Sequence, residues 1–426
     1  VYNLIFPILF LLYLPFYLIH IWRRGGLTVD YWERFGFFTA KKKAQLRALT
    51  RPVWIHAVSV GETVAAISLV KRILERNPDE QIAFSCGTST GFATAKKKMP
   101  ANVVIFYCPI DFWWAVWRTV CLIQPRMLAI FEVEIWPNLI KIPYWKGVTT
   151  VLINGRMSDH SSHGYAKWKC FFKPIFDSFT QICMQTQEDA RRIENIIGEN
   201  PEKLHFCGTM KFDQIPDCQT TDKNAVLDDC FGAGNRVVFI GGSTHPGEEE
   251  LLCNAYKTVR VAHPELKLVL VPRHQERAQE VITLLEKLGL TYKLANPLAE
   301  HPNAEGTVDV YVVNTTGELM NYFDISDICY VGKSLAGQTG GHNIIEPAIF
   351  GKAVIYGHHM ENFRQVAEIF RVENSGIELS NEDELIPALQ KLLDMPEFRI
   401  ELGKRARDTV ERHRGAIDAT LDFIKL

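Results

Sequence analysis

The sequence lacks the cysteine patterns that would indicate disulfide bonds or a structural metal site. Its ten cysteines are scattered through 426 residues, and none forms a C-x-x-C pair or another spacing typical of metal ligands. This distribution favours a reducing compartment. We therefore expect neither a disulfide framework nor a bound metal.

Strong net charge, internal repeats and low-complexity tracts are also absent. The 47 Lys and Arg residues nearly balance the 49 Asp and Glu residues, which gives a formal net charge of −2. Because this balance leaves no electrostatic footprint for nucleic acid, we expect no nucleic-acid partner. A chain of this length has room for about two or three domains.

Charged residues are missing from the first 22 positions, which read VYNLIFPILFLLYLPFYLIHIW. As a helix this segment would be about 33 Å long, enough for a hydrocarbon core of about 30 Å. Arg23 and Arg24 follow at once, so the positive-inside rule would place the rest of the chain in the cytoplasm. The sequence thus predicts a single-pass transmembrane helix over 1–22, with a helix lying in the membrane interface as the alternative.

From residue 53 onward, short apolar runs alternate with amphipathic segments such as 62–76 and 187–197. The runs that we expect to be buried strands are 53–59, 81–87, 103–109, 126–134, 148–155, 181–186, 236–243, 266–274, 308–314, 327–333 and 353–357. Apolar strands between helices are typical of parallel sheets covered on both faces. The pattern restarts after a polar stretch, so we predict an α/β fold with two doubly wound, Rossmann-like domains facing a cleft.

The expected division of the chain is an anchor, a first domain, a linker, a second domain and a last helix that crosses back to the first domain. These parts cover 1–22, 23–208, 209–235, 236–396 and 397–426. In doubly wound folds ligands bind beyond the carboxyl ends of the strands. The loops at those ends are therefore the candidate binding sites, with a different ligand on each domain.

The stretch SLAGQTGGHNIIEPAIFG (334–351) illustrates the kind of site expected there. Asn343 and Glu346 have the spacing of a helix capping box, and Gly351 can end the short helix. A glycine-rich turn before a helix suits a phosphate, and Glu346 could accept hydrogen bonds from vicinal hydroxyls. A capped surface helix without a ligand would have the same sequence.

Other strand-end residues also have two interpretations. Ser243 and Thr244 could bind a phosphate, or their turn could simply precede a helix with an acidic first turn. Arg273 suits a bidentate anion, or a buried ion pair. Glu132 and Glu134 could be catalytic, or could cap the next helix. The helical stripe formed by two tryptophans of the segment DFWWAVWRTV, Trp113 and Trp117, favours core packing.

Glu33 lies among aromatic residues in YWERFGFF (31–38). A carboxyl group in apolar surroundings tends to have a raised pKa, which suits a general base. On physical grounds alone, a structural ion pair with Arg34 or a later arginine is favoured.

Taken together, the motifs resemble those of the Kdo transferases, which transfer 3-deoxy-D-manno-oct-2-ulosonic acid to a lipid A precursor. The matching motifs occur in the family's order: ERFG (33–36), HAVSVGET (56–63), EIWPN (134–138), KFD (211–213), STHPGEE (243–249), VPRHQER (271–277), GEL (317–319), GGHNIIEPA (340–348) and NF (362–363). Each motif is weak by itself, whereas the ordered set is specific.

The resemblance implies an inverting GT-B glycosyltransferase at the inner membrane, with CMP-Kdo as donor, lipid IVA as acceptor and no cofactor. Glu33 would be the general base. The donor-binding residues would be Ser243, Thr244, Arg273, His274, Gly317, Glu318, Leu319, Gly340, Gly341, Asn343 and Glu346. The acceptor-side residues would be His56, Ser59, Gly61, Glu62, Glu132 and Glu134.

One departure from the family pattern lies close to the expected donor site. Lys333 stands where the family usually has a second glycine, and it could alter the phosphate pocket or pair with the Kdo carboxylate. Two other functions remain open. One is a GT-B transferase that uses a different nucleotide sugar on a lipid, and the other is a membrane-tethered nucleotide-sugar sensor.

Overall fold

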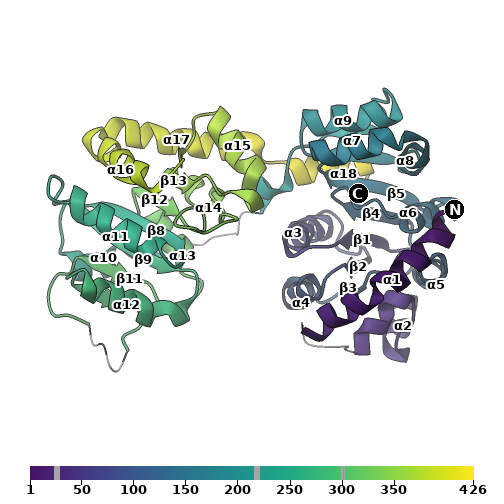
Figure 1. Cartoon of the computed structure of the whole chain (residues 1–426), viewed down its shortest axis with the longest axis horizontal. Coiled ribbons are helices and arrows are strands. Elements are labelled where there is room, and N and C mark those ends of the chain that lie inside the picture. Colours follow the sequence, from purple (N-terminus) through teal and green to yellow (C-terminus); the bar gives the residue numbers. More distant parts are fainter. Residues whose placement is uncertain (24–28, 215–220, 299–300, 302) are drawn as a thin grey trace. The chain divides into compact units, whose positions relative to one another are not determined.

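The computed structural model describes residues 1–23, 29–214, 221–298, 301 and 303–426, and its side chains are described for 1–14 of the first segment. The chain forms two compact units (Figure 1). Unit 1 comprises Val1–Gln214 and Arg414–Leu426, and unit 2 comprises Ile215–His413.

Unit 1 is built on a seven-stranded sheet of order β3-β2-β1-β4-β5-β6-β7, in which every described pairing is parallel. The strands are β1 (Val53–Ala57), β2 (Ile82–Cys86), β3 (Val104–Tyr107), β4 (Met127–Phe131), β5 (Thr149–Gly155), β6 (Gln181–Met184) and β7 (Leu204–Phe206). The helices are α1 (Tyr2–Arg23), α2 (Ala40–Arg47), α3 (Val60–Arg76), α4 (Ser89–Lys98), α5 (Trp113–Ile123), α6 (Pro137–Trp145), α7 (Asp159–Lys167), α8 (Lys169–Phe176), α9 (Gln187–Ile197) and α18 (Ala416–Ile424), with 3-10 helices η1 (Val29–Phe35) and η2 (Met210–Asp213).

Unit 2 repeats this architecture with a second seven-stranded parallel sheet, of order β10-β11-β9-β8-β12-β13-β14. The strands are β8 (Val237–Thr244), β9 (Leu266–Pro272), β10 (Tyr292–Leu294), β11 (Val310–Val312), β12 (Ile328–Val331), β13 (Ala353–Gly357) and β14 (Ile377–Leu379). The helices are α10 (Asn224–Phe231), α11 (Glu248–Val259), α12 (Ala278–Lys287), α13 (Leu319–Asp324), α14 (Ile345–Ala348), α15 (Arg364–Val372), α16 (Leu385–Asp394) and α17 (Pro396–His413), with 3-10 helices η3 (Gln275–Arg277), η4 (Glu361–Phe363) and η5 (Glu382–Glu384).

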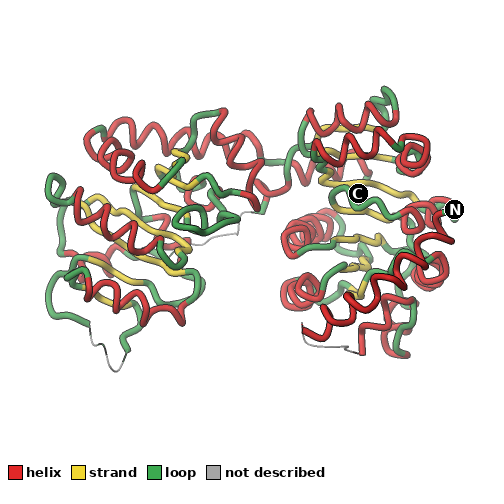
Figure 2. The backbone as a smooth tube through the Cα atoms, viewed as in Figure 1, coloured by secondary structure: helices red, strands yellow, loops and turns green. Residues whose placement is uncertain are grey.

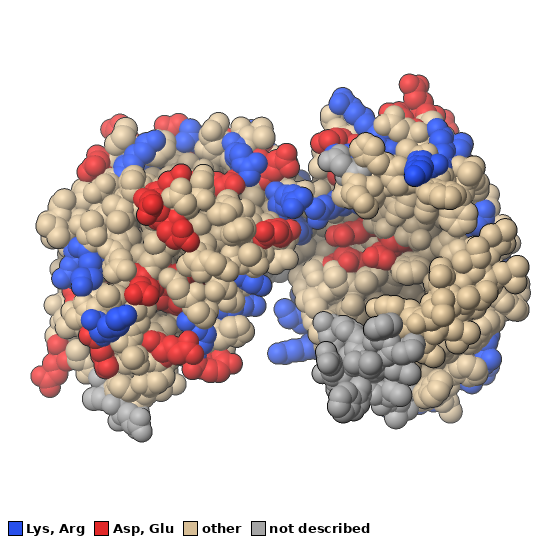
Figure 3. Space-filling model, in the orientation of Figure 1, with Lys and Arg blue, Asp and Glu red and all other residues tan. Residues whose placement is uncertain are grey.

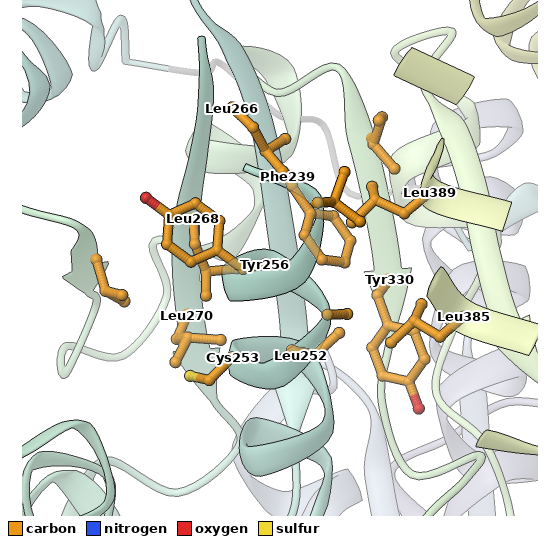
Figure 4. Packing of buried hydrophobic residues seen from close by; sticks show 14 of the residues in the cluster. Phe239, Leu252, Cys253, Tyr256, Leu266, Leu268, Leu270, Tyr330, Leu385 and Leu389 are labelled. Atoms are coloured by element: carbon orange, nitrogen blue, oxygen red, sulfur yellow. The ribbon is translucent and has the colours of Figure 1, made fainter. Parts of the chain in front are cut away.

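In each unit the strands lie between helices (Figure 2). Both sheets are buried on both faces, because successive side chains of a strand enter different apolar clusters. In β1, Val53 and Ile55 belong to one cluster and Trp54 to another. In β8, Phe239 packs with Leu252 and Tyr256 of α11 (Figure 4). The prediction of two parallel α/β sheets is confirmed.

Three strands were not expected from the sequence. They are β7, β10 and β14, and each has three residues and lies at an edge of its sheet. A short edge strand buries little surface, so it needs no long apolar run. The predicted linker 209–235 is also divided, because η2 belongs to unit 1 and α10 to unit 2.

The predicted last helix, 397–426, is two helices. They are α17 and α18, separated at Gly415, whose φ of 96° is in the left-handed region. The backbone N–H groups of Gly415 and Ile417 each donate to the Asp213 carboxylate at 2.7 Å. These bonds and the buried side chains of α18 place that helix in the core of unit 1.

Helix α1 does not support the predicted transmembrane anchor. No helix in the described part of the chain is long and apolar enough to cross a membrane. One side of α1 instead packs on unit 1: the Tyr2 hydroxyl donates to Asp111 at 2.7 Å, and the rings of Phe6 and Phe10 contact Phe112. Apolar content in a sequence does not distinguish side chains that face lipid from those that face protein.

The prediction that Trp113 and Trp117 pack in the core is wrong. Their side chains are exposed, at 55% and 44% of the reference surface. The core-facing side of α5 is formed instead by smaller residues: Ala115, Val116, Thr119, Val120 and Ile123. A helical stripe of tryptophans therefore lies on the outer side of α5.

Candidate functional site

Glu33 is held on η1 with almost no solvent exposure, at 1%. Its Oε2 atom accepts a hydrogen bond from the Tyr107 backbone N–H at 2.9 Å, whereas Oε1 has no partner among the described residues. Burial raises the pKa of Glu33 to about 7, against the Tyr107 hydrogen bond and the Lys42 charge, which both lower it. This carboxyl group can therefore hold and release a proton near neutral pH.

A cavity of about 490 Å³ lies in unit 1; residues adjacent in the chain to Glu33 and to Tyr107 line it, whereas Glu33 itself is not among the lining residues. Arg34, which follows Glu33, lines it, and so do Cys108, His56 and Glu134. Helix α1 forms one wall, and the loops after β1, β2, β3 and β4 form the remainder. The cavity thus occupies the carboxyl edge of the sheet, where ligands of doubly wound folds bind.

His56 is the next-to-last residue of β1 and is buried, with its Nδ1 atom 3.0 Å from the Ser85 hydroxyl oxygen. The pKa of His56 is lowered to about 4, mainly by burial, and the nearby Arg34 charge acts in the same direction. The imidazole is consequently neutral at pH 7 and contributes shape and hydrogen bonding to the cavity.

Ser59 and Glu62 form a complete capping box at the start of α3. The Ser59 hydroxyl accepts from the Glu62 N–H at 3.2 Å, and the Glu62 carboxylate accepts from the N–H groups of Ser59 and Val58. A Cβ atom at Gly61 would have only the Ser59 Oγ near it, at 3.9 Å, so no steric requirement for glycine exists there. The contacts of Ser59 and Glu62 are those of a helix cap.

Glu132 and Glu134 follow β4 and have different surroundings. Glu132 has a left-handed φ of 52°, and burial raises its pKa to about 7, with the Glu62 charge acting in the same direction. Lys211 and Arg156 oppose that rise, and burial lowers the pKa of Lys211. Glu134 accepts from the Trp136 indole N–H at 2.8 Å.

The cap of α6 comes from a residue that sequence reasoning missed. Asp111 accepts from the backbone N–H groups of Asn138 and Leu139, at 3.0 and 2.8 Å, and also from Tyr2. Glu132 and Glu134 therefore do not provide this cap. No local spacing signals the arrangement, because Asp111 is 27 residues away from Asn138 in the chain.

In unit 2, Ser243 and Thr244 end β8, and Arg273 directly follows β9 beside them. The Arg273 N–H donates to the Thr244 carbonyl at 3.0 Å. Ser243 has a left-handed φ of 54°, and the buried Thr244 hydroxyl has no partner within the described residues. A Cβ atom at Gly242 would lie 2.6 Å from Phe323, so the strand before this turn requires glycine.

Glu248 organises this turn and the loop after β12. It is fully buried and accepts from the backbone N–H groups of His245, Lys333 and Ser334 at 2.8–3.0 Å, and from the Tyr330 hydroxyl at 2.8 Å. The sequence suggested that the acidic residues here complement the helix dipole. Glu248 instead fixes two loops that come from different strands.

Two histidines and two cations gather at this edge of the sheet. The Nε2 atoms of His245 and His342 are 2.9 Å apart. The pKa of His245 is lowered to about 4, mainly by burial and also by the Lys333 charge. The pKa of His342 is lowered to about 3, mainly by burial and also by the Arg273 charge. Neither Arg273 nor Lys333 forms an ion pair with a carboxylate of the described residues. His274 lies close by, with its ring centroid 5.9 Å from that of His245.

Lys333 has a φ of 66°, in the left-handed region that favours glycine. Its backbone is held on both sides, because its N–H donates to Glu248 and its carbonyl accepts from Gly341 at 2.8 Å. The lysine thus places a positive charge at a backbone position that favours glycine.

Gly340 and Gly341 are required by their surroundings. Both have positive φ, and added Cβ atoms would lie 2.6 Å from the Asn362 side chain and 2.4 Å from the Met360 sulfur.

The expected cap at Asn343 is wrong by one residue, since Ile344 is the N-cap of α14. Asn343 Oδ1 accepts from Ile345 N–H at 3.2 Å, and its Nδ2 donates to Glu346 at 3.3 Å. Helix α14 has only four residues, so its dipole is small.

The GEL turn lies at the same edge. Gly317 has a φ of 84°, and a Cβ atom added there would have no atom within 4 Å; Leu319 begins α13 beside Gly242. Glu318 forms an ion pair with Lys223 at 2.8 Å, a partner that sequence reasoning missed. Unit 2 thus brings the predicted donor residues together, with Glu248, Lys333 and His342 added to them.

No group of three or more His, Cys, Asp or Glu residues in the described ranges is arranged to hold a metal ion.

Comparisons with known proteins give a consistent result. A family model described as 3-deoxy-D-manno-octulosonic-acid transferase matches residues 30–214. The chain is 34% identical to the 3-deoxy-D-manno-octulosonic acid transferase of Haemophilus influenzae, over 92% of this chain and 90% of that one. The enzyme of the same description from Bordetella pertussis is 30% identical, over 96% of each chain.

A glycosyltransferase from Rickettsia africae has a similar fold, with a TM-score of 0.57, 12% identity and coverage of 88% of this chain and 98% of that one. The sequence matches decide the family: this chain belongs to the 3-deoxy-D-manno-octulosonic acid (Kdo) transferases, which are glycosyltransferases.

Proposed function

We propose that this protein transfers Kdo from CMP-Kdo to a hydroxyl group of a lipid A precursor, lipid IVA, with Glu33 as the general base. The observation that carries the proposal is the Glu33 carboxyl group. One of its oxygens is fixed by the Tyr107 N–H, the other has no partner among the described residues, and its pKa of about 7 suits proton transfer.

In this reaction the Glu33 carboxylate takes the proton of the 6′-hydroxyl of the acceptor glucosamine. The hydroxyl oxygen then bonds to the anomeric carbon of Kdo as the bond from that carbon to the phosphate oxygen of CMP breaks, with inversion. CMP carries away the electron pair, so groups that bind its phosphate stabilise the charge that develops there.

The donor carries two anionic groups, a phosphate and the Kdo carboxylate. Arg273 and Lys333 supply two cations, and the Arg273 charge also acts on the Glu346 carboxyl group. The Thr244 hydroxyl, buried and without a partner in the described ranges, supports a role in binding the phosphate. Glu346 would accept from the ribose hydroxyls, and the turn at Gly317–Leu319 would contact the cytosine.

We further propose that the protein works at the cytoplasmic face of the inner membrane, with α1 lying in the membrane interface. On α1 the side chains of Leu4, Ile8, Leu11 and Leu12 are 59–74% exposed. The other exposed apolar residues that support this are the tryptophans Trp32, Trp113, Trp117, Trp136, Trp145 and Trp168. Figure 3 shows an uncharged surface over the first part of α1, near the N-terminus. Tryptophan is enriched at membrane interfaces, and these six exposed tryptophans all lie between residues 32 and 168.

The test is mass spectrometry of lipid IVA after incubation with CMP-Kdo and the detergent-solubilised protein. We expect added Kdo mass with the wild type and none with Glu33→Gln, which should still bind CMP. Glu75→Gln, which removes a carboxylate that is 61% exposed, is the control and should remain active.

The same assay separates the alternatives. Turnover with a UDP-sugar in place of CMP-Kdo would indicate another lipid glycosyltransferase. Binding of CMP-Kdo by a folded protein without any turnover would contradict the proposed transfer and favour a sensor.

A further inference from the structure

The cavity in unit 1 is lined by more apolar side chains than a sugar hydroxyl and its general base require. Four side chains of α1 line it, namely Phe6, Leu9, Phe10 and Tyr13. Facing them are apolar residues from the strand-end loops: Val58, Pro109, Ile110, Trp136 and Leu139. A volume of about 490 Å³ is within the range of pockets that hold small organic ligands.

Most of the polar side chains that line the cavity already form hydrogen bonds within the protein. His56 is neutral at pH 7 and bonded to Ser85. The Asp111 carboxylate accepts from Tyr2 and two backbone N–H groups, and Glu134 accepts from the Trp136 indole. With these groups satisfied, the interior favours an apolar ligand, with Arg34 as its one cationic group among the lining residues.

The cavity is continuous with the apolar outer side of α1. Leu9 and Tyr13 line the cavity and are also 57% and 59% exposed to solvent. Ile5, Ile8 and Leu12 extend this surface along the helix and are 49–70% exposed. A hydrocarbon chain that leaves a lipid surface along α1 can therefore enter the cavity without crossing a charged surface.

Two residues that line the cavity connect it to Glu33. Arg34 follows it in the chain, and Cys108 follows Tyr107, whose N–H holds the Glu33 carboxylate; both Arg34 and Cys108 line the cavity. A ligand with its polar head at Glu33 would thus have its adjoining chain at the cavity.

We infer that this cavity binds one fatty-acyl chain of the lipid acceptor, so that the chain positions the reacting hydroxyl at Glu33. The inference rests on the proposed function for the identity of the acceptor. It adds a chain-length specificity, because the walls limit how much of the chain can be buried.

The experiment uses a series of soluble N-acyl glucosamines that differ only in chain length, each kept below its micelle-forming concentration. Binding to the full-length protein is measured by calorimetry, and Kdo transfer from CMP-Kdo is measured separately. Each added methylene should tighten wild-type binding by about fourfold, until the cavity is filled and the affinity reaches a plateau.

Ile110→Trp adds volume at the cavity wall, and Phe206→Trp introduces the same side chain on the edge strand β7, outside the cavity and away from α1, at a residue that is 51% exposed. We expect Ile110→Trp to reach the plateau at a shorter chain, and Phe206→Trp to match the wild type. Unchanged binding of CMP by both variants would show that unit 2 is folded, and tryptophan fluorescence would report on unit 1.

An affinity that rises with chain length equally in the wild type and in Ile110→Trp would overturn the inference, and so would no dependence on chain length. If Ile110→Trp does not fold, Val58→Leu provides the same comparison with a smaller addition. Failure of the proposed function is distinguishable, since transfer would be absent while chain-dependent binding, shortened in the filled variant, would still support the cavity assignment.

Discussion

Replacing Glu33 by glutamine should stabilise unit 1, and the gain should depend on pH. The pKa of this carboxyl group is about 7 in the folded protein, mainly because of burial, against an ordinary value of 4.5. The folded state therefore binds the proton more tightly than the unfolded state does. The stability contributed by this proton is present in full below about pH 4.5 and is lost as pH rises through about 7.

The magnitude follows from that interval. About 2.5 pH units at about 1.4 kcal/mol each give about 3.5 kcal/mol of lost stability well above pH 7. Glutamine resembles the protonated carboxyl group and can still accept from the Tyr107 N–H. Glu33→Gln should thus be about 3.5 kcal/mol more stable than the wild type at pH 9 and close to it at pH 4.5.

Urea unfolding followed by tryptophan fluorescence measures this difference selectively, because all nine tryptophans lie between residues 22 and 168 and hence in unit 1. Glu75→Gln, at an exposed site, should change stability by less than about 1 kcal/mol at both pH values. An equal effect of Glu33→Gln at the two pH values would refute a raised pKa at this residue, and the argument for a base poised near neutral pH would lose its support.

Three further predictions concern the two sites. Kdo transfer by the wild type should fall as pH drops below about 7, since protonated Glu33 cannot act as a base; a profile that is flat down to pH 5 would contradict this. Glu248→Gln should weaken CMP-Kdo binding by about tenfold in calorimetry, because the hydrogens of the new amide would face N–H groups that now donate to the carboxylate. The control Glu250→Gln, at an exposed position, should leave the binding unchanged. Gly341→Ala should cost about 1–3 kcal/mol in unit 2 by thermal unfolding, because its Cβ would meet Met360. Gly337→Ala, which has a similar φ but open space, should cost less, and equal costs would show that the contact is unimportant.

The sequence determined the strands with long apolar runs, because a strand buried on both faces must be apolar at nearly every position. All eleven predicted runs contain strands, whereas the three-residue edge strands have no such signature. The motif order also identified the family, which the relatives confirm. The roles of the predicted site residues, Glu33 among them, remain predictions until they are measured.

Other properties were decided by tertiary structure. The apolar residues of the first segment predicted a transmembrane helix, but periodicity could not show that Phe6 and Phe10 face Phe112 and a cavity. Likewise Asp111 caps α6, and Glu248 joins the turn after β8 to the loop after β12, across separations of 27 and 85 residues. Sequence patterns record which side chains can be buried, whereas the partner of each buried group depends on which strand ends the fold brings side by side.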